Sequence, residues 1–239
     1  MNAYSALADY YEIFSDKDCD YESWSQYLYR LLKSHGCVKG ADVACGTGKM
    51  TRLLAAYGFN VLGIDNSKEM LTQATAKGHA MYVCQDMTEL ALPRKVDFIT
   101  CVNDGVNYLS DKKADVFFQR VYDNLKEGGV FVFDISTPYK LREKVGNNVF
   151  YIDNDDVTCL WCNNVTGNKV TMDLTFFKRC GELYSRSDEQ HIQYIHDVMS
   201  LVDKLTKQGF RCTVSDAYSD NELSSDSLRA TIVAIKQEV

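Results

Sequence analysis

The sequence predicts an α/β protein in which helices cover both faces of a mostly parallel sheet. Short apolar segments typical of strands alternate with segments that repeat apolar residues every three or four positions, the spacing of one helix face. The loops between them are short. Strands and helices that alternate in this way build doubly wound parallel sheets. We therefore expect such a sheet from the first 136 residues.

The individual elements of this first part follow in a regular order. A helix is expected over 21–35, where Gly36 ends the apolar repeat, and another between Ser67, a good helix cap, and Gly78. The sequence KEGG at 126–129 predicts a tight turn. The remaining expected elements are strands at 38–45, 59–64, 81–84, 96–102 and 130–135, and helices at 51–57 and 114–125.

The pattern changes after about residue 147. Residues 170–176 alternate apolar and polar side chains, and 183–195 are also extended, which predicts an antiparallel insertion of two to four strands over 147–196. A helix at 197–208 and strands at 210–218 and 229–236 close the chain. If the last two strands form an antiparallel pair, the main sheet has seven strands.

Composition excludes several classes of function. A formal net charge of −7 disfavours a nucleic-acid partner. The first residues lack a signal-peptide pattern and the apolar runs are too short for a membrane span, which with nine cysteines, read as reduced thiols, predicts a cytoplasmic protein. Cys159 and Cys162 form a lone C-x-x-C without a second ligand pair, so no metal is expected.

The loop Cys45-Gly46-Thr47-Gly48 follows the first strand and opens a helix, which is a general site for polar or anionic groups. A P-loop is excluded twice, by Val43 in place of its first glycine and by Met50 in place of Ser or Thr. A dinucleotide fingerprint is also disfavoured, because Thr51 replaces its third glycine. The loop therefore favours a nucleoside cofactor without a pyrophosphate.

Two acidic residues at later strand ends support this interpretation. Asp65 lies 19 residues after Gly46 and is suited to accept both ribose hydroxyls, and Asp86 is suited to an adenine amino group with Met87 packed beside the base. The alternative is that Asp65 and Asp86 only cap the helices that follow them. The combination with the glycine turn favours cofactor binding.

Together, ADVACGTG (41–48), VLGIDNSKEML (61–71), CQDM (84–87) and LKEGGVFVFDI (125–135) resemble the successive motifs of class I S-adenosylmethionine methyltransferases. The resemblance implies a Rossmann-like sheet and S-adenosylmethionine as cofactor. Ala44 departs from the family, since many members have glycine there. The residues implied to bind the cofactor here are Ala44, Cys45, Gly46 and Gly48 at the methionine part, Asp65, Asn66, Met70, Asp86 and Met87 at the nucleoside, and Cys101, Val102 and Asn103 at the reacting centre.

The N-terminal segment 8–24 resembles the lid of small-molecule members of this family. Aromatic faces hold cations, so Tyr11, Tyr21 and Trp24 are candidates to contact the sulfonium; for Trp24, ordinary helix packing is an equal alternative. The expected layout of the single domain is a helical lid at 1–36, a core at 37–146 and 197–239, and an insertion at 147–196 over the active site.

These observations predict methyl transfer to nitrogen or oxygen of a small molecule by in-line displacement, with the oligomeric state open. Candidates for a general base are His191, Glu189, Tyr108 and Asp104. Glu189 and His191 share one strand face, although a structural histidine is the alternative. The second half loosely resembles bacterial methyltransferases with a β lid and amino-sugar N-methyltransferases. RNA or protein methylation and non-catalytic cofactor binding remain alternatives, whereas Thr51 disfavours a nicotinamide oxidoreductase.

Overall fold

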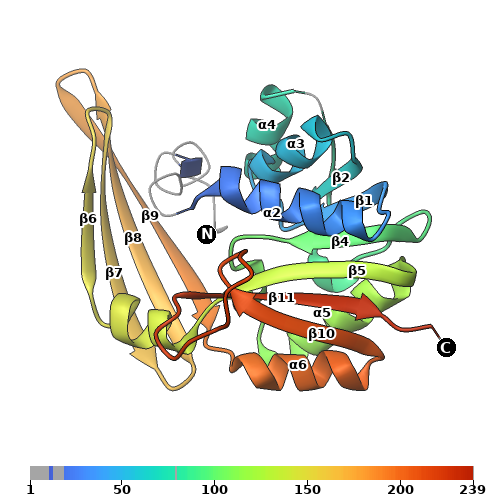
Figure 1. Ribbon diagram of the computed structural model, residues 1–239. Coiled ribbons are helices and arrows are strands. Elements are labelled where there is room, and N and C mark those ends of the chain that lie inside the picture. The colour runs from blue at the N-terminus through green and yellow to red at the C-terminus, as the bar shows by residue number, and fades with distance from the viewer. Residues whose placement is uncertain (1–10, 13–18, 79, 239) are drawn as a thin grey trace.

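The computed structural model describes residues 11–12, 19–78 and 80–238, which form two sheets (Figure 1). The larger sheet has seven strands in the order β10-β11-β5-β4-β1-β2-β3, and the smaller has four in the order β6-β7-β8-β9. The strands of the larger sheet are β1 (Lys39–Val43), β2 (Asn60–Asp65), β3 (Met81–Cys84), β4 (Val96–Cys101), β5 (Leu125–Ser136), β10 (Phe210–Asp216) and β11 (Arg229–Lys236).

The larger sheet confirms the predicted doubly wound fold. β1 to β5 pair in parallel, and β11 pairs antiparallel with both β5 and β10. From β1 the chain builds outwards to β2 and β3, then returns to place β4 on the other side of β1. The order of strands therefore reverses between β1 and β4, and ligands of such sheets bind outside the carboxyl ends of the strands at that point.

Helices cover both faces of this sheet because successive strand residues point to opposite sides. On one face, α2 (Tyr21–Ser34) and α3 (Lys49–Ala56) pack on Phe98, Val130 and Val132. On the other, α5 (Asp111–Asn124) and α6 (Val198–Lys207) pack on Ile99, Phe131 and Phe133. The remaining helical elements are α4 (Lys68–Ala76), the 3₁₀ turns η2 (Met87–Glu89) and η3 (Gly105–Tyr108), and the π-helical turn η4 (Lys140–Val145).

Side-chain caps fix where three of the helices begin. Ser67 accepts a hydrogen bond from the Met70 amide at 3.2 Å, as the sequence predicts for α4. Asp20 caps α2 and Asp197 caps α6 in the same way. Each cap satisfies an amide that has no partner within its helix.

Three strands are shorter than predicted, and the reason is the same in each case. β1 ends at Val43, β4 at Cys101 and β10 at Asp216, each followed within two residues by left-handed backbone. The left-handed residues are Ala44 (φ 54°), Asn103 (φ 65°), Asp104 (φ 54°), Ala217 (φ 37°) and Tyr218 (φ 56°). The prediction of a separate turn at 126–129 was also wrong. β5 already begins at Leu125, and residues 126–129 lie within it, where the pairing with β4 shifts its register between Val96 and Phe98.

The predicted antiparallel insertion is confirmed as a four-stranded meander of β6 (Val149–Asp153), β7 (Val157–Thr166), β8 (Lys169–Cys180) and β9 (Leu183–Tyr194). Figure 1 shows this sheet beside the larger one rather than continuous with it. Its inner face has an apolar core of its own, which includes Val170, Met172 and Phe176. The buried Asn107 amide joins the two parts, because it donates to the Ser136 and Tyr194 carbonyls at 3.3 and 2.9 Å.

A buried ion pair lies where β5 and β11 meet. Asp134 is completely buried, and its carboxylate accepts hydrogen bonds from the Arg229 guanidinium and, at 2.5 Å, from the Tyr218 hydroxyl. It also accepts the amides of Asn103 and Asp104 at 2.6 and 2.9 Å. The carboxylate thus holds the closing hairpin against the left-handed turn that follows β4.

This pair generates a prediction about stability. Arg229→Met should lower the free energy of unfolding by about 3–5 kcal/mol, because it leaves a buried carboxylate without its counter-charge. The measurement is urea unfolding of the variant and the parent protein. The two m-values should be equal, so that the difference between the midpoints reports the difference in stability.

The matched control is Lys126→Met, which breaks the exposed Lys126–Asp97 pair, whose charged atoms lie 2.6 Å apart. Exposed pairs contribute about 0–1 kcal/mol. Equal destabilisation by both substitutions would contradict the importance assigned to the buried pair.

Candidate active site

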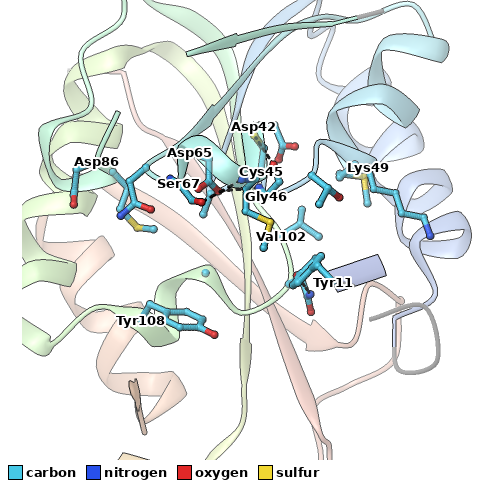
Figure 2. Close-up of a pocket in the computed structure, with 18 of the residues that line it drawn as sticks. Tyr11, Asp42, Cys45, Gly46, Lys49, Asp65, Ser67, Asp86, Val102 and Tyr108 are labelled. Carbon is cyan, nitrogen blue, oxygen red and sulfur yellow. Dashed lines mark hydrogen bonds between the residues drawn. The ribbon is translucent and has the colours of Figure 1, made fainter. Parts of the chain in front are cut away.

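A cavity of about 490 Å³ lies at the carboxyl ends of β1, β2 and β4, where the strand order reverses. Figure 2 shows the loop after β1, the end of β2 and the ring of Tyr108 gathered around it. Its volume falls within the range of about 300–1,000 Å³ that is usual for ligand pockets. The predicted cofactor residues that line it are Tyr11, Tyr21, Ala44, Cys45, Gly46, Asp65, Asn66, Met70, Asp86, Met87, Val102 and Asn103.

The loop after β1 forms one wall of the cavity. Ala44 and Gly46 both have φ near 54°, so the chain turns sharply and brings backbone rather than bulky side chains to the cavity. A Cβ added at Gly46 would lie 3.9 Å from the Tyr11 ring. Gly48 does not line the cavity: it begins α3 with φ 73°, and a Cβ there would clash with the Tyr82 hydroxyl.

Asp65 ties the loop to the end of β2. One carboxylate oxygen accepts the Gly46 amide at 2.8 Å, and the other accepts the Ser67 amide at 2.9 Å. Burial raises the pKa of Asp65, although these amide hydrogen bonds oppose the rise. Each carboxylate oxygen has about two acceptor positions, so the carboxylate retains capacity for ligand hydroxyls.

Asp86 has the capping role that the sequence left open as an alternative. One of its oxygens accepts the Thr88 amide at 2.8 Å and the Thr88 hydroxyl at 2.7 Å, which caps η2. Burial alone would raise the pKa of Asp86, but these hydrogen bonds outweigh it and lower the pKa. Asp86 and Met87 also line the cavity, so capping and ligand contact are compatible.

Two further predicted residues do not reach the cavity. Trp24 is buried against the core, stacked on Tyr218 with ring centroids 4.9 Å apart and with the Arg229 guanidinium 4.8 Å from its ring. Helix packing, the alternative for this residue, accounts for its position. Cys101 is fully buried in the core beneath Gly105.

The Asn103 side chain organises the edge of the cavity beside Tyr11. Its amide nitrogen donates to the hydroxyls of Tyr11 and Tyr21 at 2.9 and 3.3 Å. Its carbonyl oxygen accepts from Arg229 at 3.1 Å and from the Cys19 thiol at 3.2 Å. Burial raises the pKa of both tyrosines, so they remain neutral hydroxyls at neutral pH.

A second cavity of about 180 Å³ lies between the core and the insertion, and we call it the acceptor chamber. Tyr11, Asn103 and Tyr108 line both cavities, so the two meet at these residues. The rest of the chamber combines an apolar wall from the insertion with polar groups from the core. Its other lining residues are Cys19, Asp104, Ser136, Lys140, Leu141, Val145, Ile152, Cys159, Trp161, Met172, Leu174, His191, Gln193 and Arg229.

The structure brings the three predicted catalytic residues to this chamber or directly behind it. His191 lines the chamber, and its Nε2 lies 3.2 Å from Glu189 Oε2. Only 3% of His191 and 4% of Glu189 are exposed. The Tyr108 ring stands edge-on to His191, with ring centroids 6.1 Å apart. Asp104, the fourth candidate, also lines the chamber.

Sequence reasoning missed Asp42, which lines the cofactor-side cavity from within β1. Its carboxylate accepts the Thr51 and Thr100 hydroxyls at 2.6 and 2.8 Å. Burial raises its pKa from 3.8 to about 6. An acidic residue between Ala41 and Val43, in the apolar part of the predicted strand, was the available signal. Arg229 and Lys140 in the chamber were also missed, because they come from segments without a motif.

Cys159 and Cys162 lie on opposite faces of β7, since Cys159 is buried and Cys162 exposed. They therefore do not converge on one ion. Among the residues that the structure describes, no three His, Cys, Asp or Glu side chains are grouped to hold a metal. Within the same residues, no helix is long and apolar enough to cross a bilayer.

The sheet order and the cavity at its switch point define an α/β protein built to bind a nucleotide-like cofactor. The family model for a methyltransferase domain matches residues 41–129. A protein of Geobacillus sp. (strain WCH70) named "putative methyltransferase" is 32% identical over 247 residues, covering 98% of this chain and 99% of that protein.

Solved structures agree. An S-adenosylmethionine-dependent methyltransferase from Clostridium acetobutylicum superposes with a TM-score of 0.90 and 33% identity, covering 99% of this chain and all of that one. The sugar N-methyltransferase KedS8 from Streptoalloteichus has a TM-score of 0.80 at 18% identity over 95% of this chain and 93% of its own, a likeness of fold. The chain belongs to the class I S-adenosylmethionine-dependent methyltransferases.

Asp42 generates a prediction about pH. The folded protein holds the Asp42 proton more tightly than the unfolded chain, so the stability it contributes is present below about pH 4 and lost as pH rises through about 6. At about 1.4 kcal/mol per pKa unit, the loss is about 3 kcal/mol. Asp42→Asn, which does not ionise, should therefore gain about 3 kcal/mol relative to the parent protein between pH 4 and pH 7 in urea unfolding.

The control is Asp203→Asn, which changes an exposed carboxylate on α6 and should show no such pH-dependent difference. A difference between Asp42→Asn and the parent protein that is the same at both pH values would contradict the raised pKa.

Proposed function

We propose that this methyltransferase transfers the methyl group to nitrogen or oxygen of a small molecule bound in the acceptor chamber. The observation that carries the proposal is the junction of the two cavities at Tyr11, Asn103 and Tyr108. A donor in the larger cavity and an acceptor in the smaller would meet there. The chamber holds the volume of about six waters at about 30 Å³ each, which suits a small acceptor rather than a macromolecule.

The residues of the larger cavity fit S-adenosylmethionine. Asp65 would accept the ribose hydroxyls, with Asn66, Met70, Asp86 and Met87 around the adenine. Ala44, Cys45 and Gly46 would face the methionine part, because their sharp turn brings backbone and small side chains to this wall of the cavity. Tyr11 and Tyr21 would present aromatic surface to the sulfonium, since both line the larger cavity and Tyr11 lies at the junction.

Bound in this cavity, S-adenosylmethionine would supply an electrophilic methyl carbon to a lone pair of the acceptor, with S-adenosylhomocysteine as the leaving product. The protein's part is to align the two partners and exclude water. Asn103 fixes the Tyr11 and Tyr21 hydroxyls, so the junction is rigid before ligands arrive. The apolar wall of the insertion, including Met172 and Leu174, keeps the acceptor's surroundings dry.

His191 is the proposed base for the acceptor's proton, because it lines the chamber while Glu189 sits behind it. The Glu189 carboxylate would orient the imidazole, as a carboxylate does for a catalytic histidine. Tyr108 would pack against the imidazole and direct the acceptor towards the junction. The insertion would then be both wall and source of the base.

RNA or protein methylation is disfavoured by the small chamber and by the net charge of −7. A role limited to cofactor binding would not account for the buried His191–Glu189 pair or for the chamber. The related fold of KedS8, a sugar N-methyltransferase, supports a small-molecule acceptor here.

The first test concerns cofactor binding. Asp65→Ala should weaken S-adenosylhomocysteine binding by about 10–100-fold, because two ribose hydrogen bonds to a carboxylate and the anchor of the Gly46 amide are lost together. Isothermal titration calorimetry measures this directly. Asp203→Ala, an exposed site on α6, is the control and should bind as the parent protein does. A parent protein that releases no heat with either form of the cofactor would refute the assignment.

The second test concerns the base. His191→Asn should lower kcat by about 10²–10⁴-fold with an acceptor that must lose a proton, while leaving S-adenosylmethionine affinity unchanged. Glu189→Gln should lower kcat less and shift the pH profile, since it acts through the histidine. Unchanged kcat in His191→Asn at every pH would exclude His191 as the base.

A further inference from the structure

The Asp104 carboxylate lines the acceptor chamber from a turn with left-handed backbone. Asn103 and Asp104 both have left-handed backbone, with φ of 65° and 54°. Non-glycine residues rarely adopt this conformation, although Asn and Asp do so more readily than most, and it occurs where the surrounding structure enforces it. Here the enforcing group is Asp134, whose two oxygens accept the two amides.

The Asp104 side chain is itself positioned by the end of β5. Its carboxylate accepts the Ser136 hydroxyl at 2.9 Å, and both residues line the chamber. Asp104 directly follows Asn103, one of the three residues at the junction of the cavities. A negative charge is therefore fixed beside the place where the methyl group is transferred.

Among the residues that the structure describes, Asp104 is the one carboxylate that lines the chamber. Arg229 also lines the chamber and attracts Asp104 electrostatically, but its guanidinium is hydrogen-bonded to Asp134 and to the Asn103 carbonyl rather than to Asp104. Lys140 adds a positive charge from η4, so a cationic ligand group is disfavoured near it. Glu189 lies behind His191 rather than among the lining residues. A cation entering the chamber would therefore turn towards Asp104.

We infer that the acceptor is a small amine with an apolar substituent, and that Asp104 binds its ammonium group beside the junction of the two cavities. The inference rests on the proposed function and names its substrate class. The apolar substituent would lie against Ile152, Met172 and Leu174 of the insertion. A carboxylate recognises an ammonium through a charge-assisted hydrogen bond, which an alcohol of the same shape makes only in weaker, neutral form.

The chemistry is balanced without any further reactant. The bound ammonium gives one proton to His191, which leaves a neutral amine with a free lone pair. That lone pair forms the nitrogen–carbon bond as the carbon–sulfur bond of the donor breaks, and the sulfur keeps the electron pair. The methylated nitrogen is again a cation, and Asp104 accompanies it throughout, whereas the proton leaves through His191 to solvent.

The test uses two probes that differ only in the group recognised, isobutylamine and isobutanol, titrated at pH 7 into protein saturated with S-adenosylhomocysteine. We expect the parent protein to bind the amine at least about tenfold more tightly than the alcohol. Asp104→Asn should weaken amine binding by about 10–100-fold and leave alcohol binding unchanged. Asparagine adopts left-handed backbone readily, so this variant keeps the turn and loses only the charge.

Asp203→Asn is the matched control, since it makes the same change on an exposed helix face and should alter neither affinity. The inference is overturned if the alcohol binds as tightly as the amine, if the amine does not bind, or if Asp104→Asn binds the amine as the parent does. If the parent protein does not bind S-adenosylhomocysteine at all, the proposed function is refuted instead. The failure of the inference and the failure of the proposed function are therefore distinguishable.

Discussion

The buried carboxylate of Asp134 is the interaction on which the site depends. It is completely buried, and the structure gives it hydrogen bonds from two amides, a tyrosine hydroxyl and a guanidinium. A buried charge is tolerated only with such partners, so the groups around it are fixed in place. Those groups come from the turn after β4 and from the closing hairpin, and three of them, Asn103, Asp104 and Arg229, line the cavities. One side chain thus links the packing of the sheet to the geometry of the reaction.

Carboxylates held by several hydrogen bonds also occur near the ends of the neighbouring strands. Asp42 is held by two threonine hydroxyls, and Asp65 by two backbone amides. None of the described hydrogen bonds to these two carboxylates comes from a lysine or arginine. Neutral donors keep these two carboxylates ordered without cancelling their charge. Two such carboxylates at the strand ends suit a cofactor that carries a sulfonium cation.

Much of the fold was predictable because its signals are local. The alternation of strands and helices, the cap at Ser67 and the glycine loop with Asp65 all lie within short stretches of sequence. The strand ends were misjudged where left-handed backbone falls on residues that rarely adopt it, namely Ala44, Ala217 and Tyr218. Distant contacts hold some of these turns: the Asp134 carboxylate, far along the chain, accepts the Asn103 amide and the Tyr218 hydroxyl. Propensity cannot reveal a conformation that a distant side chain enforces.

The cofactor side and the acceptor chamber also differ in how readily the sequence predicts them. The cofactor side is built from consecutive strand ends of one sheet, so its residues keep a fixed spacing and form readable motifs. The acceptor chamber draws single residues from segments as distant as Cys19, Trp161 and Arg229, whose meeting depends on how the insertion packs on the core. Such a chamber can change its acceptor by substitutions in the insertion while the cofactor side stays constant. In the amine recognition that we propose, Asp104 belongs to the core turn after β4, so the group that would bind the reacting end of the acceptor stays with the core when the insertion changes.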